Sequence, residues 1–283
     1  MAAYTIDDLY GLVRAAKRCV ALTGAGVSTL SGIRDFRGKN GLYVDRELDA
    51  QKMFDIGYFM RDPAFYYKTA TFLYDIDGIE PSLVHTTLAE MEERGLVKAI
   101  VTQNVDALHQ RGGAKRVLEV HGSPAVHYCM KCGDQGSAEE LALEGLGAKV
   151  PNGSDMMNFF DVVKVLKAGE LPTCKRCGAV LKPAITFFGE ALPQMTFQAA
   201  IHETAHADLL LCLGTSLTVY PAAGLPEYTL RSGGKVVIVN NQPTPLDARA
   251  SMRFSELGEV FEGLSALMKA ESGTAHDAGH EAK

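Results

Sequence analysis

The chain has 283 residues, of which 47% are hydrophobic and 22% are charged, and its formal net charge is −6. This length suits one large domain or two small ones, with a core that needs no covalent staples. The acidic balance argues against a nucleic-acid binder that works by neutralising phosphates. No run approaches the roughly 18 apolar residues of a membrane span, and the first residues do not resemble a secretory leader. We therefore expect a cytoplasmic protein without a membrane partner.

Helical and strand patterns alternate along the chain, which is typical of βαβ units and a mostly parallel sheet. A helix is predicted from Thr5 to about Lys17, with Asp8 at the capping-box position. Short apolar runs predict buried strands at 19–23, 99–102, 117–120, 184–188, 209–213 and 236–239. Helices are expected at 82–94, 194–206 and 221–231. Ligands of parallel α/β sheets bind at the carboxyl ends of the strands, so the polar residues that follow these runs are the first candidates for a site.

Two insertions interrupt this alternation. Residues 35–81, rich in Phe, Tyr and Asp, predict a loop and helical insertion. Residues 125–182, bounded by two cysteine pairs, predict a separate small domain. A discontinuous α/β domain is left, made of 1–34, 82–124 and 183–270. Residues 271–283 lack apolar periodicity and are expected to form a disordered tail.

The cysteines divide into two groups. Four of them form two C-x2-C pairs: Cys129, Cys132, Cys174 and Cys177. Four thiolates predict one closed, tetrahedral structural zinc site, which stabilises a unit too small for a core of its own. The spacer of 41 residues, 133–173, is longer than in compact zinc ribbons, and we interpret its extra residues as two short helices at 137–146 and 155–167. Two unrelated redox motifs are the alternative. The other two cysteines lie in apolar strands and are expected to be inert core thiols: Cys19 and Cys212.

Residues 22–29, LTGAGVST, form a glycine-rich turn between a strand and a helix-like stretch. Such a turn resembles a dinucleotide phosphate cradle, in which backbone N–H groups meet a diphosphate. The fingerprint is incomplete, because Thr29 stands at the third glycine position and the next glycine is Gly32. A plain turn is the alternative. The charged loop at 31–38, SGIRDFRG, favours a lid over a cofactor, with an ordinary exposed loop as the alternative.

Two further strand ends carry polar groups. Gln103, Asn104 and Asp106 follow one strand, and their amides and carboxylate suit a carboxamide and a ribose. Helix capping explains Asn104 and Asp106 equally well. His121 follows another strand and precedes Gly122, which leaves room for a ligand. The ordinary pKa of histidine suits a general base near neutral pH, whereas a purely structural role is the alternative.

Taken together, the sequence resembles the sirtuin family of NAD-dependent protein deacylases. The matching segments stand in family order over most of residues 5–265: GAGVSTLSGIRDFRG (24–38), TQNVDALHQRGG (102–113), EVHG (119–122), the two cysteine pairs, ITFFGE (185–190), GTSLTVYPAAGLP (214–226) and VIVNNQPTPLD (237–247). The resemblance implies a Rossmann-like large domain with a parallel sheet, an inserted small zinc-binding domain, and a cleft between them. NAD as co-substrate and an acylated lysine of a protein or peptide would meet in that cleft.

The resemblance also implies roles for single residues. His121 would be the general base, acting beside Asn104 and Asp106. Phe36 would shield the reacting carbon from water. The residues implied in NAD binding are Gly24, Ala25, Gly26, Ser28, Thr29, Asp35, Phe36, Arg37, Gln103, Asn104, Val105, Asp106, Gly214, Thr215, Ser216, Asn240, Asn241 and Leu257. The substrate would bind as an added strand along Thr186, Phe188, Gly189, Glu190, Val219 and Tyr220. The implied products of this acyl transfer are nicotinamide, free lysine and O-acyl-ADP-ribose.

Two departures from the family pattern bear on specificity. Arg34 stands where the family usually has proline, beside the expected nicotinamide pocket. Desuccinylating members carry Tyr-x-x-Arg, whereas this chain has Tyr66 followed by Thr69. Lys68 is one position away and does not reproduce a bidentate clamp on an acidic acyl group. We therefore expect deacetylation, or removal of another uncharged acyl group.

Three other interpretations stay open. A sirtuin-type ADP-ribosyltransferase would share the cleavage of NAD and would place ADP-ribose on a protein side chain. A dehydrogenase on a Rossmann fold is a second alternative, which the mismatch at Thr29 disfavours. A non-catalytic, NAD-sensing zinc protein that binds DNA is the third. Its local basic patch would be Lys131, Lys175 and Arg176, but the net charge of −6 disfavours nucleic acid as a partner.

Overall fold

The computed structural model of the protein describes residues 4–35, 41, 50–75, 78–132, 134–143, 146–152 and 154–278. Its main sheet has six parallel strands in the order β11-β10-β9-β1-β2-β3. Their bounds are β1 (Cys19–Thr23), β2 (Ala99–Thr102), β3 (Val117–Glu119), β9 (Leu209–Leu213), β10 (Lys235–Val239) and β11 (Met252–Phe254). The chain steps from β1 to β3 in one direction and from β9 to β11 in the other. The strand order therefore reverses between β1 and β9, which is where such sheets bind ligands.

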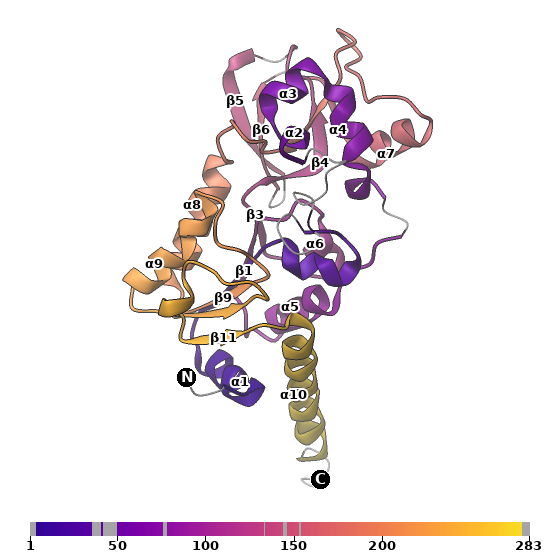
Figure 1. Cartoon of the computed structure of the whole chain (residues 1–283). Helices are drawn as coiled ribbons and strands as arrows, with labels where there is room; N and C mark the ends of the chain where they lie inside the picture. The colour runs from indigo at the N-terminus through magenta and orange to yellow at the C-terminus, as the bar shows by residue number, and fades with distance from the viewer. Residues whose placement is uncertain are drawn as a thin grey trace.

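Helices cover both faces of this sheet (Figure 1). One face packs against α1 (Ile6–Ala15), α5 (Leu83–Glu93) and α10 (Leu257–Ala278), and the other against α8 (Gln194–His206) and α9 (Leu225–Arg231). Successive strand residues point to opposite faces, so Cys19 and Ala21 of β1 join the first core cluster while Val20 and Leu22 join the second. The predicted α/β fold with a parallel sheet is thus confirmed.

Local sequence signals explain the ends of several helices. Thr5 caps α1 as predicted: its Oγ1 accepts from the Asp8 N–H at 3.1 Å, and the Asp8 carboxylate accepts from the Thr5 N–H at 2.8 Å. Helix α5 is followed by Gly95 at φ +71°, a conformation that favours glycine. Among the described residues, no helix is both long and apolar enough to cross a bilayer.

A second, three-stranded sheet in the order β7-β4-β8 carries the cysteine pairs. It consists of β4 (Gly122–Tyr128), β7 (Met156–Asn158) and β8 (Lys182–Ile185). Helix α7 (Phe159–Lys167) packs on it, and β5 (Asp134–Leu143) pairs with β6 (Leu146–Asn152) in a hairpin. Because β4 pairs with β8, this sheet reaches Gly122 and Ile185, which lie beyond the two ends of the predicted range of 125–182.

The first insertion joins this small domain. Its helices are α2 (Ala50–Met53), α3 (Ile56–Arg61) and α4 (Pro63–Thr69), and α6 (Leu108–Arg111) follows β2 in the large domain. Short 3-10 helices complete the described elements: η1 (Ala25–Ser31), η2 (Thr71–Leu73), η3 (Ala222–Gly224) and η4 (Asp247–Arg249). Phe59, Tyr66 and Leu73 pack with Val162 and Phe187 in one aromatic-rich core. Figure 1 shows α2, α3 and α4 gathered beside β4, at the end of the molecule opposite α10.

Two predictions about local structure are wrong. The described part of 137–146, residues 137–143 and 146, lies in strands β5 and β6 rather than in a helix, because pairing between the two strands overrides their local helix preference. The predicted disordered tail is helical over 271–278, where α10 continues through residues that include the poor helix formers Gly273 and Thr274. The packing of Phe261 and Leu264 on the sheet nucleates that helix, so its extension costs little. Residues 279–283 lie outside the described residues.

Candidate active site

The four paired cysteines come together at the base of the small domain. Their Sγ atoms all lie within 4.8 Å of one another, with Cys129–Cys177 and Cys132–Cys174 each at 3.6 Å. A tetrahedron with Zn–S bonds of about 2.3 Å has edges of about 3.8 Å, so the cluster fits one zinc ion with no open position. The Lys131 and Arg176 N–H groups point at the first thiol of their pairs, at 3.4 Å. The thiols therefore suit a closed structural zinc site.

Cys19 and Cys212 take no part in this cluster. Both are fully buried, in β1 and β9, and burial raises the pKa of each thiol. Because the thiolate is the reactive form, these residues are inert core thiols, as predicted.

The glycine-rich turn follows β1 at the switch point of the main sheet. The Gly24 N–H donates to the Leu213 carbonyl, and the Gly26 N–H donates to the Gly214 carbonyl at 2.9 Å. A Cβ on Gly26 would lie 2.7 Å from the Gly214 Cα, so the two backbones touch here. The helix that follows is 3-10 rather than α, and the Thr29 hydroxyl donates to the Gly26 carbonyl at 2.8 Å.

Polar side chains from the turn and from the end of β2 form one hydrogen-bonded cluster. The Ser28 hydroxyl donates to the Asp106 carboxylate at 2.7 Å. The Asn104 amide donates to the Gly24 carbonyl and to the Ser28 hydroxyl, both at 3.1 Å. Burial raises the pKa of Asp106, and the bond from Ser28 opposes that shift. These hydrogen bonds thus connect the turn after β1 with the residues that follow β2, which are about 80 positions apart in sequence.

His121 lies at the edge of this cluster, two residues after the end of β3. Its Nδ1 is 2.9 Å from the Gln103 carbonyl oxygen, which only accepts, so Nδ1 carries the proton and Nε2 keeps its lone pair. The Gln103 side chain donates to the Thr215 hydroxyl at 2.9 Å, which ties the end of β2 to the loop after β9. Burial lowers the pKa of His121, and the imidazole is neutral at neutral pH.

Two cavities meet at His121. The first, of about 770 Å³, opens over the carboxyl ends of the main strands, and the second, of about 780 Å³, lies between the 186–198 segment and the 219–221 loop. Both volumes fall in the range of roughly 300–1,000 Å³ typical of ligand pockets. The residues that line both cavities are His121, Thr186, Phe188 and Val219.

The cavities account for the predicted site residues that the structure describes. The first is lined by Gly24, Ala25, Gly26, Ser28, Thr29, Asp35, Gln103, Asn104, Val105, Asp106, Gly214, Thr215, Ser216, Asn240, Asn241 and Leu257. The second is lined by Thr186, Phe188, Gly189, Glu190, Val219 and Tyr220. Phe36 and Arg37 lie outside the described residues. The individual roles of all these residues stay predictions.

Comparison with known proteins identifies the architecture. A sequence model of the Sir2 family matches residues 24–221. The chain belongs to the Sir2 family. It is 41% identical over 251 residues to the NAD-dependent protein deacetylase of Thermotoga maritima, covering 88% of this chain and 92% of the relative. It is 38% identical to NAD-dependent protein deacylase 2 of Archaeoglobus fulgidus, covering 87% and 89%.

Solved structures agree with this assignment. A complex described as Sir2, p53 peptide and NAD+ superimposes with a TM-score of 0.76 at 36% identity, covering 95% of this sirtuin and 99% of that chain. A structure of Sir2Tm bound to a propionylated peptide gives a TM-score of 0.75, also at 36% identity, covering 95% and 99%. The fold and the order of the site elements are therefore those of the family.

Sequence reasoning missed the apolar part of the first cavity. Phe54, Phe72 and Leu73 of the first insertion line it, together with Ile33 and Ile185. No local motif marks these residues, because only tertiary packing brings the insertion to the wall of this cavity. Their position beside Val105 gives the cavity an apolar wall where it approaches His121.

Two buried histidines beneath the site were also missed. The His85 Nδ1 accepts from the Ser82 N–H at 3.0 Å, and its Nε2 lies 3.4 Å from the Ser28 hydroxyl. The His109 Nε2 lies 2.9 Å from the Thr23 hydroxyl. Burial lowers their pKa values to about 4 and about 3. Both rings are uncharged at neutral pH and hold hydroxyl groups next to the polar cluster. Sequence reasoning missed them because nothing in a single sequence distinguishes a buried histidine from an exposed one.

Three buried histidines and one buried glutamate together predict that the free energy of unfolding falls in acid. His85, His109 and His127 have pKa values of about 4, 3 and 3, so below pH 6.5 protons bind them only in the unfolded chain. Burial raises the pKa of Glu119 to about 8, so its proton favours the folded state and opposes this effect. Summing the four, we expect the free energy of unfolding to fall by about 2 kcal/mol from pH 7 to pH 5.5.

Urea unfolding at the two pH values measures this change. Glu119→Gln removes the opposing proton, so its free energy of unfolding is expected to fall by about 4 kcal/mol over the same interval. Equal or greater stability of the unmodified chain at pH 5.5 would show that the buried histidines are not neutral in the folded state.

Proposed function

We propose that this sirtuin is an NAD-dependent protein lysine deacylase that works as a deacetylase. The observation that carries the proposal is the meeting of two ligand-sized cavities at one imidazole, that of His121. One cavity has the glycine turn and polar strand ends suited to a dinucleotide, and the other has exposed apolar side chains suited to a peptide. The names of the relatives, which are NAD-dependent protein deacetylases and deacylases, support the same activity.

The first cavity fits NAD on two counts. Gly24, Gly26 and Gly214 let two backbone segments pack directly against each other, and both segments line the cavity, where their backbone suits the approach of a diphosphate. Amides and hydroxyls at the strand ends supply donors for two riboses and a carboxamide, with Asn240 and Asn241 at the β10 end. When bound, NAD would supply nicotinamide as the leaving group and the ribose whose hydroxyl receives the acyl group. Phe36 and Arg37 are proposed to close over it.

His121 is proposed as the general base. Its Nδ1–H is held by the Gln103 carbonyl, so Nε2 is the atom that takes a proton. Because burial lowers the pKa of the ring, Nε2 is free at neutral pH. Asn104 and Asp106 are proposed to seat the nicotinamide end of NAD, since Ser28 and Gly24 already fix their orientation.

The acylated protein is proposed to bind as an added strand between the 186–190 and 217–221 segments. Exposed aromatic side chains flank that groove: Phe188 is 47% exposed and Tyr220 is 75% exposed. The backbone of Phe188 is already paired, since its N–H donates to Phe54 and its carbonyl accepts from Ile56. An added strand therefore depends on neighbouring backbone groups, with Gly189 on one side and Val219 on the other.

The state of the residues that align with the Tyr-x-x-Arg clamp predicts preference for uncharged acyl groups. The Thr69 hydroxyl donates to Phe65 and Tyr66 carbonyls of its own helix, and Tyr66 is buried with its hydroxyl 3.1 Å from that of Tyr74. Lys68 is exposed on α4. We expect an acetyl-lysine peptide to turn over at least about 10-fold faster than its succinyl counterpart, because a desolvated carboxylate lacks its bidentate partner. A succinyl rate above the acetyl rate would contradict this.

The close contact between Gly26 and Gly214 predicts that Gly26 does not tolerate a larger residue. The Cβ of Gly26→Ala would meet backbone atoms of Gly214, which cannot move as a side chain does. We expect a loss of about 1–3 kcal/mol in stability and weaker NAD binding, measured by thermal unfolding and calorimetry. Gly11→Ala is the matched control: its Cβ in α1 meets nothing within 4 Å, so stability should hold or rise. Unchanged NAD affinity in Gly26→Ala would show that the glycine-rich turn does not contribute to NAD binding.

The proposal is tested by nicotinamide release. With NAD and an acetyl-lysine peptide, chromatography should show nicotinamide formed in step with loss of the acetyl group from the peptide. The unacetylated peptide should release little. Nicotinamide release that does not depend on the acetyl group would contradict the proposed function.

A further inference from the structure

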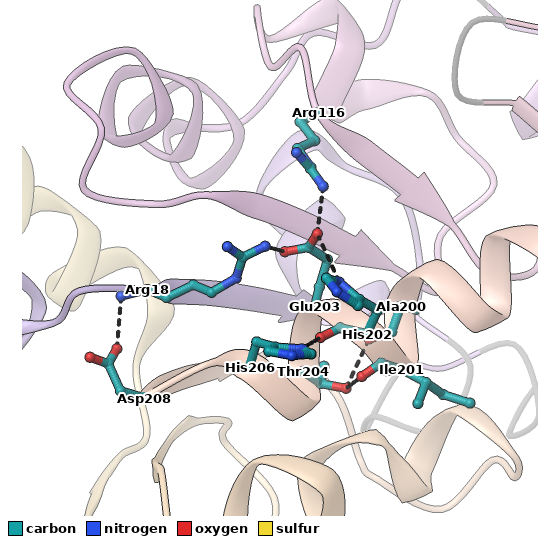
Figure 2. Close-up of polar contacts among 9 residues, drawn as sticks. All are labelled: Arg18, Arg116, Ala200, Ile201, His202, Glu203, Thr204, His206 and Asp208. Atoms are coloured by element: carbon teal, nitrogen blue, oxygen red, sulfur yellow. Dashed lines mark hydrogen bonds and ion pairs between the residues drawn. The ribbon is translucent and has the colours of Figure 1, made fainter. Parts of the chain in front are cut away.

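Two histidines on the outer face of α8 take no part in the site described above. His202 and His206 are both exposed and stand one helical turn apart, with ring centroids 4.2 Å from each other and planes inclined by 33°. Figure 2 shows the two rings beside each other on α8. Residues four apart share one face of a helix. The segment His202–His206, with sequence H-E-T-A-H, has the spacing with which helices present two imidazoles to one metal ion.

The polar contacts of the two rings are made through Nδ1. The His206 Nδ1 is 2.8 Å from the His202 carbonyl oxygen, which can only accept, so Nδ1 carries the proton. This is the usual arrangement of a metal-binding histidine, and it leaves the His206 Nε2 as the ligand atom. The His202 Nδ1 lies 3.8 Å from a Glu203 carboxylate oxygen, which is too long for a hydrogen bond, so no hydrogen bond within the described residues fixes that ring in another orientation.

Glu203 is not available for hydrolytic chemistry at this place. In H-E-x-x-H metalloproteases the glutamate is the general base. Here its side chain is only 2% exposed, and its two oxygens are bound by Arg18 at 2.6 Å and Arg116 at 2.5 Å (Figure 2). A carboxylate held between two guanidinium groups neither activates water nor turns to a metal. The pair is thus suited to binding and not to catalysis.

We propose that His202 and His206 form a two-imidazole chelate site for a late divalent transition metal: Ni²⁺, Cu²⁺ or Zn²⁺. Neutral imidazole prefers these ions, whereas Mg²⁺ and Ca²⁺ prefer oxygen ligands. Among the described residues, the four cysteines are the one cluster of three or more metal-binding side chains, so water completes the coordination at α8. Because the chelate needs the helical spacing, the bound ion stabilises the folded chain. This site is independent of the proposed deacylase activity.

Calorimetric titration with Ni²⁺ tests the site in the full-length, zinc-loaded protein. The background variant is H276Q/H280Q, because His276 and His280 have the same spacing in sequence. We expect it to bind one Ni²⁺ per chain. Adding H206Q or H202Q should weaken binding at least about 10-fold, since loss of even an outer partner of a metal ligand costs that much.

A variant with the same number of histidines separates chelation from general attraction to imidazole. In A199H/H202Q, made in the same background, the rings stand seven residues apart, or about 10 Å along the helix, too far for one ion. Ni²⁺ binding should be lost although circular dichroism shows the folded protein. The proposal is overturned if the background variant binds no Ni²⁺, or if H206Q or A199H/H202Q binds it as tightly as the background.

Discussion

His121→Gln should lower the rate of deacetylation by about 10²–10⁴-fold, the usual contribution of a positioned general base. The glutamine amide is neutral and cannot take a proton at the position of the His121 Nε2, whose partner Nδ1–H is held by the Gln103 carbonyl. NAD affinity should change little, because the glycine turn and the Asn104–Asp106 cluster are untouched. Calorimetry for NAD and turnover of an acetyl-lysine peptide give the two readouts separately.

The pH profile of the unmodified enzyme gives a further check on His121. Burial lowers the pKa of the ring below its ordinary value, so the base is already unprotonated at neutral pH. We therefore expect kcat/KM to be level on the alkaline side and to decline only in acid.

If His121→Gln keeps most of its deacetylase activity, another group is the general base.

Removal of the zinc ion is the second change with a large expected effect. Around the cysteines the core is small, with Leu181 as the one large buried apolar residue of that cluster in the described chain. Metal binding therefore holds together the two cysteine turns, which lie outside the aromatic-rich core and connect to β4 and β8. β4 starts directly after His121 and β8 ends directly before Thr186, so unfolding there disturbs both cavities. We expect chelated protein to lose at least about 90% of its activity.

Hydrogen exchange locates the consequence of zinc removal. β4 and β8 should lose protection, whereas β1 and β9 of the main sheet should keep it. Added Zn²⁺ should restore the unmodified chain and should not restore Cys174→Ser, which lacks one ligand. Loss of activity with unchanged protection of β4 and β8 and unchanged NAD affinity would contradict a structural zinc, because it would place the ion in the chemistry.

The sequence predicts the regular part of this molecule well, for reasons that are local. Apolar runs such as 209–213 and 236–239 are long enough to be buried strands and too short for helices. Thr5 and Asp8 mark the start of α1 by side-chain chemistry that operates within four residues. The cysteine spacing predicts the metal cluster because each C-x2-C pair forms its own turn.

What the sequence does not predict depends on contacts between distant segments. The β5–β6 strands are specified by their mutual pairing, and their polar, alanine-rich composition favours helix when read alone. The apolar wall at Phe54, Phe72 and Leu73 exists only because the first insertion folds onto the small domain. The same holds for His85 and His109, whose burial beneath Ser28 and Thr23 follows from packing of α5 and α6 under the turn.

The most direct test of the central claim follows the acyl group itself. Mass spectrometry of the small molecules formed from NAD and an acetyl-lysine peptide should show O-acetyl-ADP-ribose and nicotinamide in equal amounts, with the peptide lighter by one acetyl group. ADP-ribose attached to protein, with the acetyl group still on the peptide, would contradict a deacylase and would favour ADP-ribosyl transfer.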